Sequence, residues 1–467
     1  MRLVFLFLLL HLATNAFAAE PVITYDEHIK PIFREHCLKC HGEDEHKAGL
    51  NLSTHATVLK GGSGGAAVVA GRASTSLLFK AITDTDDESR MPPKKAPLPA
   101  AQIELIRTWI QTGLRESSAS QSLSAARDIG FKPVANAAAK LDGPPPMPEK
   151  LPPFTAPVTK RPLPVVAMAA SPTAPLLAVA GQEHVRLVDL NTQQTLGALP
   201  FPEGQPNVIH FSHDGSVLMV AGGKPVQSGC VVLYDVRNGK RLTSVGDETD
   251  AVLAADLSPD QKLIALGGSG KVVKVYGTTD GKLRYKLTKH TDWITAISFS
   301  PDGSKLASAD RAGGIVLWDT SGGAAAGTAG ILLTLAEHKA AVRALAWRGD
   351  SRMLASGGED GQLVWWDVQD GWPAILNNNA HPPARAAGIY GKLPNGVIAL
   401  AFGPAGELLS AGRDRQVRLW AADGKALHAF ANNESLPLQA AIRNDGKTFV
   451  AGDAAGQLHF WAGNAKP

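Results

Sequence analysis

Cysteine is scarce in this chain, and its scarcity excludes several classes of protein. Only 3 of the 467 residues are cysteines, namely Cys37, Cys40 and Cys230. Three cysteines cannot build the disulfide framework of a small secreted scaffold. A structural zinc site needs four ligands, usually two spaced pairs of Cys or His, and Cys230 is too far along the chain to complete such a pair. We expect Cys230 to be a buried apolar residue, because it precedes the strand-like run Val231 to Tyr234.

Long apolar runs and clusters of like charge are also missing. The one nearly unbroken apolar run, Leu3 to Leu12, is shorter than the roughly 20 residues that cross a bilayer. The net charge is +3, and no stripe of Lys and Arg is visible. These features exclude nucleic acid and an anionic membrane surface as expected partners. We expect no GxSxG nucleophile elbow, and the motif HExxH is absent, so the common hydrolase sites are not expected.

The first 18 residues have the pattern of a cleaved signal peptide. Met1 and Arg2 give a positive start, the apolar run follows, and Ala16 and Ala18 form a small-x-small cleavage site. An uncleaved membrane anchor is the alternative. We therefore expect a mature protein without a membrane span, in the periplasm or cell envelope of a bacterium.

Residues 37–41 read CLKCH, the attachment pattern of a c-type haem. This spacing allows Cys37 and Cys40 to form thioethers with the two vinyl groups at one porphyrin edge, while His41 turns its imidazole onto the iron as proximal ligand. A disulfide, a zinc site and a thioredoxin-like CxxC are the alternatives, although the residues before Cys37 look helical rather than strand-like. The sequence thus predicts one covalent haem c.

Met91 is the predicted distal ligand of the iron. It is the only methionine between the signal and residue 117, and two prolines stiffen the backbone after it. A thioether favours ferrous iron and raises the reduction potential, which suits an electron carrier. His28, His46, His55 and an open sixth position remain as alternatives.

Two helices are expected around this motif. Thr24 and Glu27 have capping-box spacing, and an apolar face then leads to Cys37, with a kink or a restart at Pro31. A second helix is expected over residues 100–112. Its residues Ile106 and Trp109 either cover the haem or belong to a core that is unrelated to it.

The chain is expected to contain a haem domain at 20–116, a linker at 117–156 and a repetitive domain at 157–467. The linker is rich in Ala, Ser and Pro, and it is either a free tether or a strap along one of the domains. Turn signals recur in the repeats as SHDGS, SPDQK, SPDGS, RGDSR, GPAGE and RNDGK. Strand segments recur in step as VRLVDL, VVLYDV, VVKVYG, IVLWDT, LVWWDV, VRLWAA and LHFWAG.

With four short strands in each unit, these seven units resemble an all-β, seven-bladed WD-repeat propeller. The segment from about 157 to 163 is expected to complete the last blade. In the fifth unit, four residues fall at the positions of the family's hydrogen-bonded structural tetrad, namely His338, Ser356, Asp360 and Trp366. The other units look degenerate, and His381 reads as a surface-loop residue. The acidic cluster at 84–88 reads as a solvated loop rather than a calcium site.

Residues 25 to 114 resemble the planctomycete-type cytochrome c domain of large exported bacterial proteins. The motifs that carry the resemblance are DEHIKPIF, CLKCHG, GLNLST, LKGGSGGAAVVAG, RMPP and QIELIRTWI. The resemblance implies a small all-α, class I-like cytochrome c fold. It also implies Cys37 and Cys40 as attachment sites, His41 as proximal ligand and Met91 as distal ligand.

Together these patterns predict an electron carrier rather than an enzyme. The haem would pass single electrons to a redox partner protein, and the propeller would dock a protein. The alternative is an envelope binding scaffold whose haem senses redox state or a ligand. A haem peroxidase needs an exchangeable distal position, and occupation of that position by Met91 argues against it.

Overall fold

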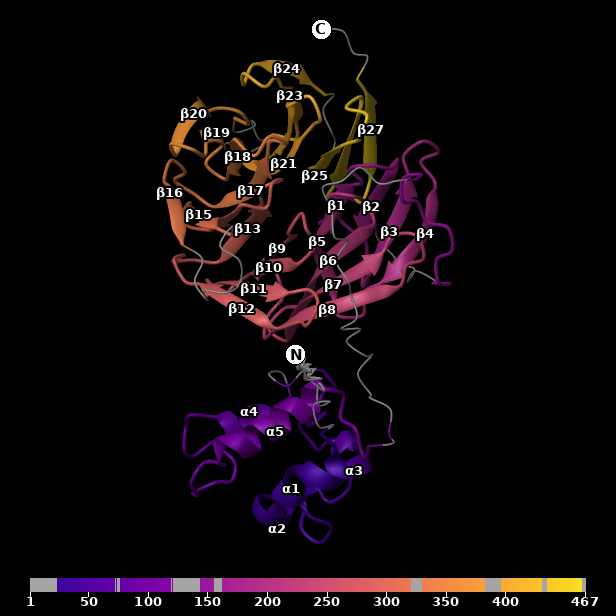
Figure 1. Cartoon of the computed structure of the whole chain (residues 1–467), viewed down its shortest axis with the longest axis vertical. Helices are drawn as coiled ribbons and strands as arrows, with labels where there is room; N and C mark the ends of the chain where they lie inside the picture. Colours follow the sequence, from indigo (N-terminus) through magenta and orange to yellow (C-terminus); the bar gives the residue numbers. More distant parts are fainter. Residues whose placement is uncertain are drawn as a thin grey trace, which may run out of the picture. The chain divides into compact units, whose positions relative to one another are not determined.

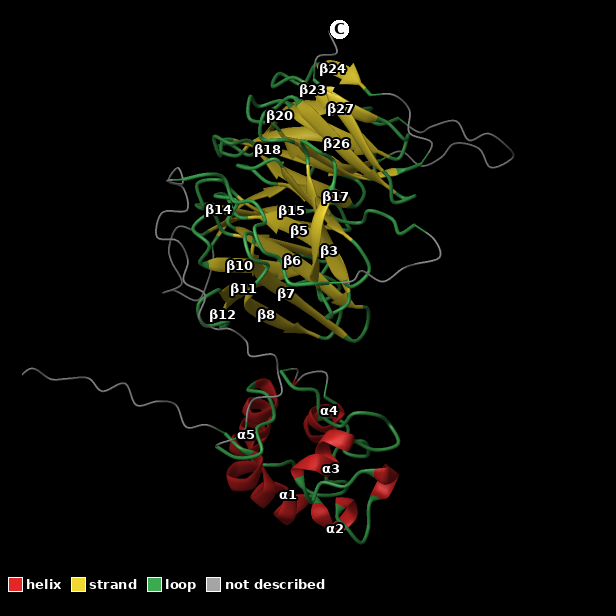
Figure 2. Ribbon diagram, turned by 90° about the vertical axis from the view of Figure 1, so that its right-hand side faces the viewer, coloured by secondary structure: helices red, strands yellow, loops and turns green. Residues whose placement is uncertain are grey.

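The computed structural model describes residues 23–71, 73, 76–118, 120, 143–154, 162–320, 330–382, 396–430 and 435–463. The chain divides into two compact units, residues 1–126 and 127–467, one helical and one built of strands (Figures 1 and 2). The expected signal peptide at 1–18 lies outside the described residues. In the part of the chain that is described, no helix is long and apolar enough to cross a membrane.

The first unit consists of short helices. They are a π-helical turn Tyr25–Ile29, α1 Lys30–His36, α2 Leu38–His41, a 3-10 turn Lys47–Gly49, α3 His55–Lys60, α4 Leu77–Thr83 and α5 Ala100–Gln111. The Thr24 hydroxyl accepts a hydrogen bond from the backbone N–H of Glu27, as the capping pattern predicts. Pro31 lies in the first turn of α1, where its missing N–H costs no hydrogen bond. The predicted restart of the helix at this point is confirmed.

The core of this unit is aromatic. Trp109 of α5 is fully buried, and its ring lies 5.8 Å from Tyr25 and 6.5 Å from Phe33 between centroids. The indole Nε1 donates to the carbonyl oxygen of Arg115 at 2.9 Å. Ile106 is fully buried in the same cluster. Both residues are therefore part of the core that fixes α5 against the first helices.

The second unit is a β-propeller of seven antiparallel sheets. Blade one holds β1 Met168–Ala170, β2 Leu176–Ala180, β3 His184–Asp189 and β4 Thr195–Pro200; blade two holds β5 Gln205–Phe211, β6 Val217–Lys224, β7 Ser228–Asp235 and β8 Arg241–Glu248. Blade three holds β9 Ala254–Leu257, β10 Leu263–Gly267, β11 Val273–Gly277 and β12 Leu283–Leu287; blade four holds β13 Ile294–Phe299, β14 Lys305–Asp310, β15 Ile315–Asp319 and β16 Ile331–Leu335. Blade five holds β17 Val342–Trp347, β18 Met353–Gly358, β19 Leu363–Asp367 and β20 Trp372–Asn377; blade six holds β21 Val397–Phe402, β22 Leu408–Gly412, β23 Val417–Trp420 and β24 Ala426–Ala429; blade seven holds β25 Pro437–Ile442, β26 Thr448–Asp453 and β27 Leu458–Ala462.

The recurring turn signals form the same local structure in successive blades. In the second blade, the Ser212 hydroxyl donates to Asp214 at 2.6 Å and accepts from the N–H of Val217 at 2.9 Å. Gly215 follows with φ of +73°, a conformation that glycine adopts without steric cost. The turn therefore holds two neighbouring strands in register, which is why its signal recurs with the blades.

The two ends of the ring meet at the first and last blades. The backbone N–H of Val165 donates to the carbonyl oxygen of Asp453 at 3.0 Å, and Gln439 Nε2 donates to the carbonyl oxygen of Val166 at 2.8 Å. Three strands are described in the last blade. Most of the segment expected to complete it, 157–163, lies outside the described residues.

Residues 143–154 of the expected linker lie along the propeller. The N–H of Glu149 donates to the carbonyl oxygen of Arg237 at 2.8 Å, and the Arg237 guanidinium donates to the Glu149 carboxylate at 2.6 Å. Met147 and Leu151 pack on the apolar core of the first two blades. This stretch is therefore a strap, while residues 121–142 are outside the described residues.

Three buried tetrads stabilise the propeller. In each, a His ring lies between an Asp carboxylate and a Ser hydroxyl, and that hydroxyl also accepts from a Trp indole at 2.8 Å. The members are His290, Ser308, Asp310 and Trp318; His338, Ser356, Asp360 and Trp366; and His381, Ser410, Asp414 and Trp420. The tetrad predicted for the fifth unit is confirmed. The expectation that the other units are degenerate is wrong for units four and six, which hold the other two tetrads.

The surface-loop prediction for His381 is wrong. The residue is fully buried, and its Nε2 lies 2.7 Å from Ser410 Oγ. Two of the tetrads separate His from Ser by 18 residues, whereas this one separates them by 29 because residues 383–395 intervene. The longer spacing hid the tetrad, although the Ser to Trp spacing of 10 residues is the same in all three.

We expect Ser410→Ala to lower the free energy of unfolding of the propeller by about 2 to 4 kcal/mol, because it leaves the Trp420 N–H and the His381 Nε2 buried without a partner, while His381 Nδ1 keeps its contact with Asp414. Chemical denaturation of the full chain measures this change. Thr195→Ala, which removes an exposed hydroxyl, is the control and should change little. Equal stability of the two variants would show that the tetrad contributes nothing.

Candidate haem site

The residues of CLKCH lie where α1 passes into α2. Cys37 ends α1, and its N–H donates to the carbonyl oxygen of Phe33 at 2.8 Å. Cys40 and His41 follow on the single turn of α2, where the N–H of each donates to the carbonyl oxygen of Cys37. The chain turns at Gly42, where a Cβ would lie 2.5 Å from the carbonyl oxygen of Leu38. Only glycine allows this close approach directly after the histidine.

Both cysteines carry free thiols, and both are partly buried. Burial raises the pKa of the Cys37 thiol to about 11. A thioredoxin-like site instead lowers the pKa of its attacking cysteine to favour the thiolate. The helical segment before Cys37 is equally unlike the strand that precedes such a site. The pair therefore lacks both the lowered pKa and the preceding strand of a thiol-exchange site.

The His41 ring is held by one nitrogen. Its Nδ1 lies 3.3 Å from the carbonyl oxygen of Leu50, and the N–H of Leu52 donates to the carbonyl oxygen of His41 at 2.7 Å. A hydrogen bond from Nδ1 to a carbonyl fixes the tautomer that leaves the Nε2 lone pair for a metal. This is the arrangement expected of a proximal haem ligand.

Met91 lies in the turn between α4 and α5. Its N–H donates to the carbonyl oxygen of Ala81 at 2.8 Å, and the residue is 39 % exposed, a high value for a methionine. The role of Met91 as distal ligand stays a prediction, and the exposure of its side chain leaves the thioether accessible for binding iron.

The histidine alternatives differ in their availability. His55 Nε2 lies 2.6 Å from the carbonyl oxygen of Leu114, and its ring is packed against Tyr25 and Trp109. His28 Nδ1 lies 3.2 Å from the N–H of Thr24 at the start of the first helical turn. Only His46 is exposed. The contacts of His28 and His55 therefore favour Met91 or His46 as the distal ligand.

Apolar side chains near the motif fit a porphyrin. Leu50, whose carbonyl oxygen faces His41 Nδ1, has a partly buried side chain. Gly62 packs closely against it, because a Cβ at Gly62 would lie 3.1 Å from the Leu50 Cβ. A Cβ on nearby Gly64 would lie 3.8 Å from Leu77, which is 46 % exposed. Exposed apolar groups of this kind are covered when a flat apolar cofactor binds. Two free thiols, one oriented imidazole and this apolar surface together fit a covalent haem c.

The described residues do not form a second candidate metal site. Among the described residues, no group of three or more His, Cys, Asp or Glu side chains is placed to hold a metal ion. In the acidic cluster, Asp84 accepts from the N–H of Asp86, and Asp86 accepts from the N–H of Glu88. The Ser89 hydroxyl holds the pKa of Asp86 below its usual value. These carboxylates therefore cap the backbone of an exposed turn.

Comparison with known families matches both units. Residues 37–95 match the family described as Planctomycete cytochrome C. Residues 281–319, 330–367 and 389–421 match the WD domain, G-beta repeat. The first match contains all four predicted haem residues, and the second begins at β12 of blade three and extends over strands of blades four to six.

Several curated proteins whose names include WD repeats are similar to this chain. The chain is 35 % identical to the WD repeat and SOCS box-containing protein 1 of Danio rerio over 56 % of its own length and 62 % of that protein. It is 30 % identical to the protein of the same name from Xenopus tropicalis over 25 % of its length and 29 % of that protein. An uncharacterised WD repeat-containing protein of Synechocystis is 26 % identical over 30 % of this chain and 40 % of that protein. The chain spans less than two thirds of the length of these relatives.

The family matches and the geometry agree on the architecture, and the predicted fold class is confirmed. The small helical unit matches the planctomycete cytochrome c family over residues 37–95, and the unit that follows is a seven-bladed β-propeller in which three segments match the WD domain, G-beta repeat.

Proposed function

We propose that this protein is an exported c-type cytochrome that carries one covalent haem for single-electron transfer. The observation that carries the proposal is the arrangement at the α1 to α2 junction, with two free thiols and an imidazole whose Nε2 is available. A bound haem supplies the one-electron chemistry, and the protein supplies its attachment, orientation and shielding from water. Cys37 and Cys40 would hold the porphyrin, and His41 and Met91 would ligate the iron.

Export to the periplasm or cell envelope belongs to the same proposal. Attachment of haem c takes place outside the bacterial cytoplasm, and residues 1–18 have the composition of a signal peptide. The two features support each other, because the haem motif requires the compartment to which the signal directs the chain.

The propeller would dock a partner protein. Trp293 is 41 % exposed, and the Arg311 guanidinium lies 4.6 Å from its ring centroid. Trp372 of β20 is 72 % exposed. Exposed Trp and Arg side chains are typical of protein interfaces and of their energetic hot spots. These residues support a protein partner, which would be the redox partner itself or a second protein.

A second candidate function is a binding scaffold in which the haem senses redox state or a ligand. The exposure of Met91 favours this candidate, because an exposed side chain can leave the iron and open the sixth position to a ligand. Carbon monoxide distinguishes the two functions on the full exported chain. A reduced haem that stays six-coordinate and does not bind carbon monoxide supports the carrier, whereas rapid binding supports the sensor and reopens a peroxidase activity.

Replacement of Met91 tests the distal ligand. We expect Met91→Ala to abolish any methionine-to-iron charge-transfer band. We also expect it to lower the reduction potential by more than about 59 mV, a tenfold change in the equilibrium constant of a one-electron couple. Absorbance and potentiometric titration of the full chain measure both effects. Met147→Ala, in the strap of the propeller, is the control; an unchanged band and potential in the Met91 variant would remove Met91 from the site.

A further inference from the structure

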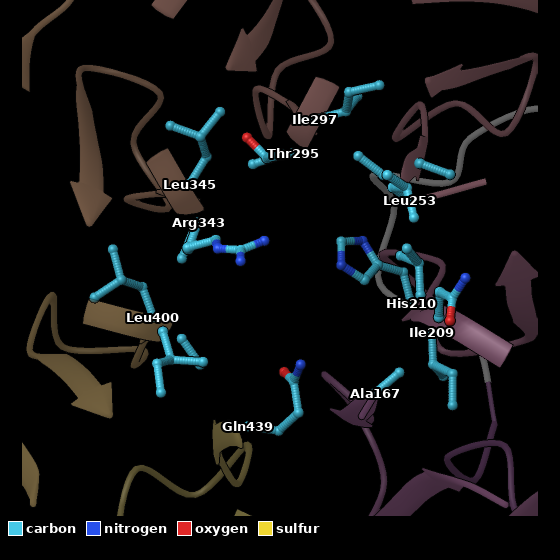
Figure 3. Close-up of a pocket in the computed structure, with 18 of the residues that line it drawn as sticks. Ala167, Ile209, His210, Leu253, Thr295, Ile297, Arg343, Leu345, Leu400 and Gln439 are labelled. Atoms are coloured by element: carbon cyan, nitrogen blue, oxygen red, sulfur yellow. The ribbon is translucent and has the colours of Figure 1, made fainter. Parts of the chain in front are cut away.

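The innermost strands of the seven blades surround a channel that the proposed electron transfer does not use. Its cavity has a volume of about 180 Å³. The lining residues come from β1, β5, β13, β17, β21 and β25 and from the start of β9 (Figure 3). Every blade therefore contributes to one site on the axis of the propeller.

The wall of the channel carries both polar and aliphatic side chains. Of the large aliphatic residues in its lining, Leu253, Leu345 and Leu400 are partly exposed (Figure 3), whereas Ile209 and Ile297 are buried in the cores of their blades. None of the lining residues that the structure describes is an Asp or a Glu. The channel thus offers apolar contacts and no carboxylate that would repel an anion at its surface.

Two nitrogen-bearing side chains enter this space from opposite walls. Arg343 of β17 and His210 of β5 extend into the channel and point toward each other (Figure 3). The Arg343 side chain is 47 % exposed and that of His210 is 43 % exposed, so both face the open space. Each is oriented by a carboxylate that lies behind it.

His210 is supported by Asp256. Its Nδ1 lies 2.8 Å from Asp256 Oδ1, and this carboxylate also accepts from the backbone N–H groups of Leu257 and Phe299. Burial lowers the pKa of His210, but the Asp256 carboxylate opposes this effect and raises the pKa above its ordinary value. A protonated ring bonded to Asp256 through Nδ1 directs Nε2–H into the channel.

Arg343 is supported in the same way. Its Nε donates to Glu359 Oε1 at 2.8 Å, and Arg413 also donates to this carboxylate. The three side chains carry a net charge of +1, while protonated His210 and Asp256 sum to zero. The guanidinium keeps its Nη groups on the channel side, where they can donate to an anion.

The remaining polar residues of the lining are engaged with the backbone. Asn207 Nδ2 donates to the carbonyl oxygen of Val252 at 3.0 Å, and Gln439 Nε2 donates to that of Val166 at 2.8 Å. Thr295 Oγ1 donates to the carbonyl oxygen of Val342 at 2.6 Å. These bonds tie neighbouring blades together, so Arg343 and His210 are left as the donors for a ligand.

We propose that the central channel binds a small organic carboxylate, with the charged group between Arg343 and His210 and the apolar part against the partly exposed side chains of Leu253, Leu345 and Leu400. A carboxylate matches the planar fork of an arginine. These three leucines favour a ligand with a short hydrocarbon chain over a fully hydrated inorganic anion, because transfer of apolar surface out of water is favourable.

Calorimetric titration of the full chain with hexanoate tests the proposal. We expect saturable binding that is weakened at least tenfold in Arg343→Gln, since a hydrogen bond to a charged group is worth about that factor or more. His210→Gln should also weaken binding. Arg311→Gln is the matched control, because it removes an arginine that pairs with Asp292 and stacks on Trp293 without lining the channel.

Two comparison ligands separate the physical contributions. Hexan-1-ol has the same chain without the charge, and sulfate has the charge without the chain; both should bind much more weakly than hexanoate. Equal binding of sulfate would overturn the preference for an organic carboxylate. Absence of hexanoate binding, or equal affinity in the Arg343→Gln and Arg311→Gln variants, would overturn the site itself. Thermal unfolding of each variant shows that the propeller is still folded.

Discussion

Replacing Cys37 and Cys40 together with alanine is expected to abolish covalent haem attachment completely. The two thiols lie three residues apart across the α1 to α2 junction, and His41 follows on the same turn. The third cysteine of the chain, Cys230, is buried between β-strands of the propeller and cannot substitute for them. Any haem held by the double variant would be bound only by the iron ligands His41 and Met91 and by apolar contacts, and denaturation would release it.

The measurement is the intact mass of protein exported from a host that is competent in cytochrome maturation. The unmodified chain should carry the mass of one haem after denaturation, and the double variant should carry none. Cys230→Ala is the matched control and should keep the haem. If the unmodified chain has only the mass of the mature polypeptide, the redox function proposed for this protein is wrong, and a propeller-based adaptor is what remains.

Truncation of Trp109 is expected to lower the free energy of unfolding of the helical unit by about 3 to 5 kcal/mol. The indole is fully buried among Tyr25, Phe33 and His55, with ring centroids between 5.8 and 6.5 Å away. The variant Trp109→Ala leaves a cavity and also removes one of the two donors to the carbonyl oxygen of Arg115, which keeps its bond from the backbone N–H of Tyr25. A loss of this size is a large fraction of the stability of a domain of about 100 residues.

Denaturant titration of the full chain, followed by amide hydrogen exchange, assigns the loss to one unit. Exchange should accelerate in α1 and α5 and stay unchanged in the propeller strands, because the two units have separate cores. Trp372→Ala removes the same side chain from an exposed position on β20 and should change stability by less than about 0.5 kcal/mol. Similar losses in the two variants would contradict the central role of Trp109 in the core.

Local signals in the sequence were sufficient for much of the fold. The capping pair of Thr24 and Glu27 begins the first helical turn, and Pro31 restarts the helix where its N–H is not needed. The turn signals recur because each one closes the same hydrogen-bonded turn, as at Ser212 and Asp214. Such features depend on neighbours within a few residues, so they can be predicted without the tertiary structure.

Only the local part of the candidate haem site, the CLKCH motif, can be read from neighbouring residues in the same way. The CLKCH spacing needs only one helical turn, whereas the contact between His41 and Leu50 depends on how the following loop folds back. The availability of Met91 and the engagement of His55 with Leu114 likewise depend on distant parts of the chain. A sequence can nominate these residues, but it does not show which of them remain free to bind iron.

By itself, the sequence determined the periodic and local elements: the haem motif, the seven repeated units and the turns between their strands. The tertiary structure decided which distant polar groups meet. It brought His381 to Ser410 across a long insertion, and it placed Arg343 opposite His210 on strands of different blades. The physical reason is that hydrogen bonds and ion pairs in a closed ring depend on the positions of all blades, and no spacing along the chain encodes those positions directly.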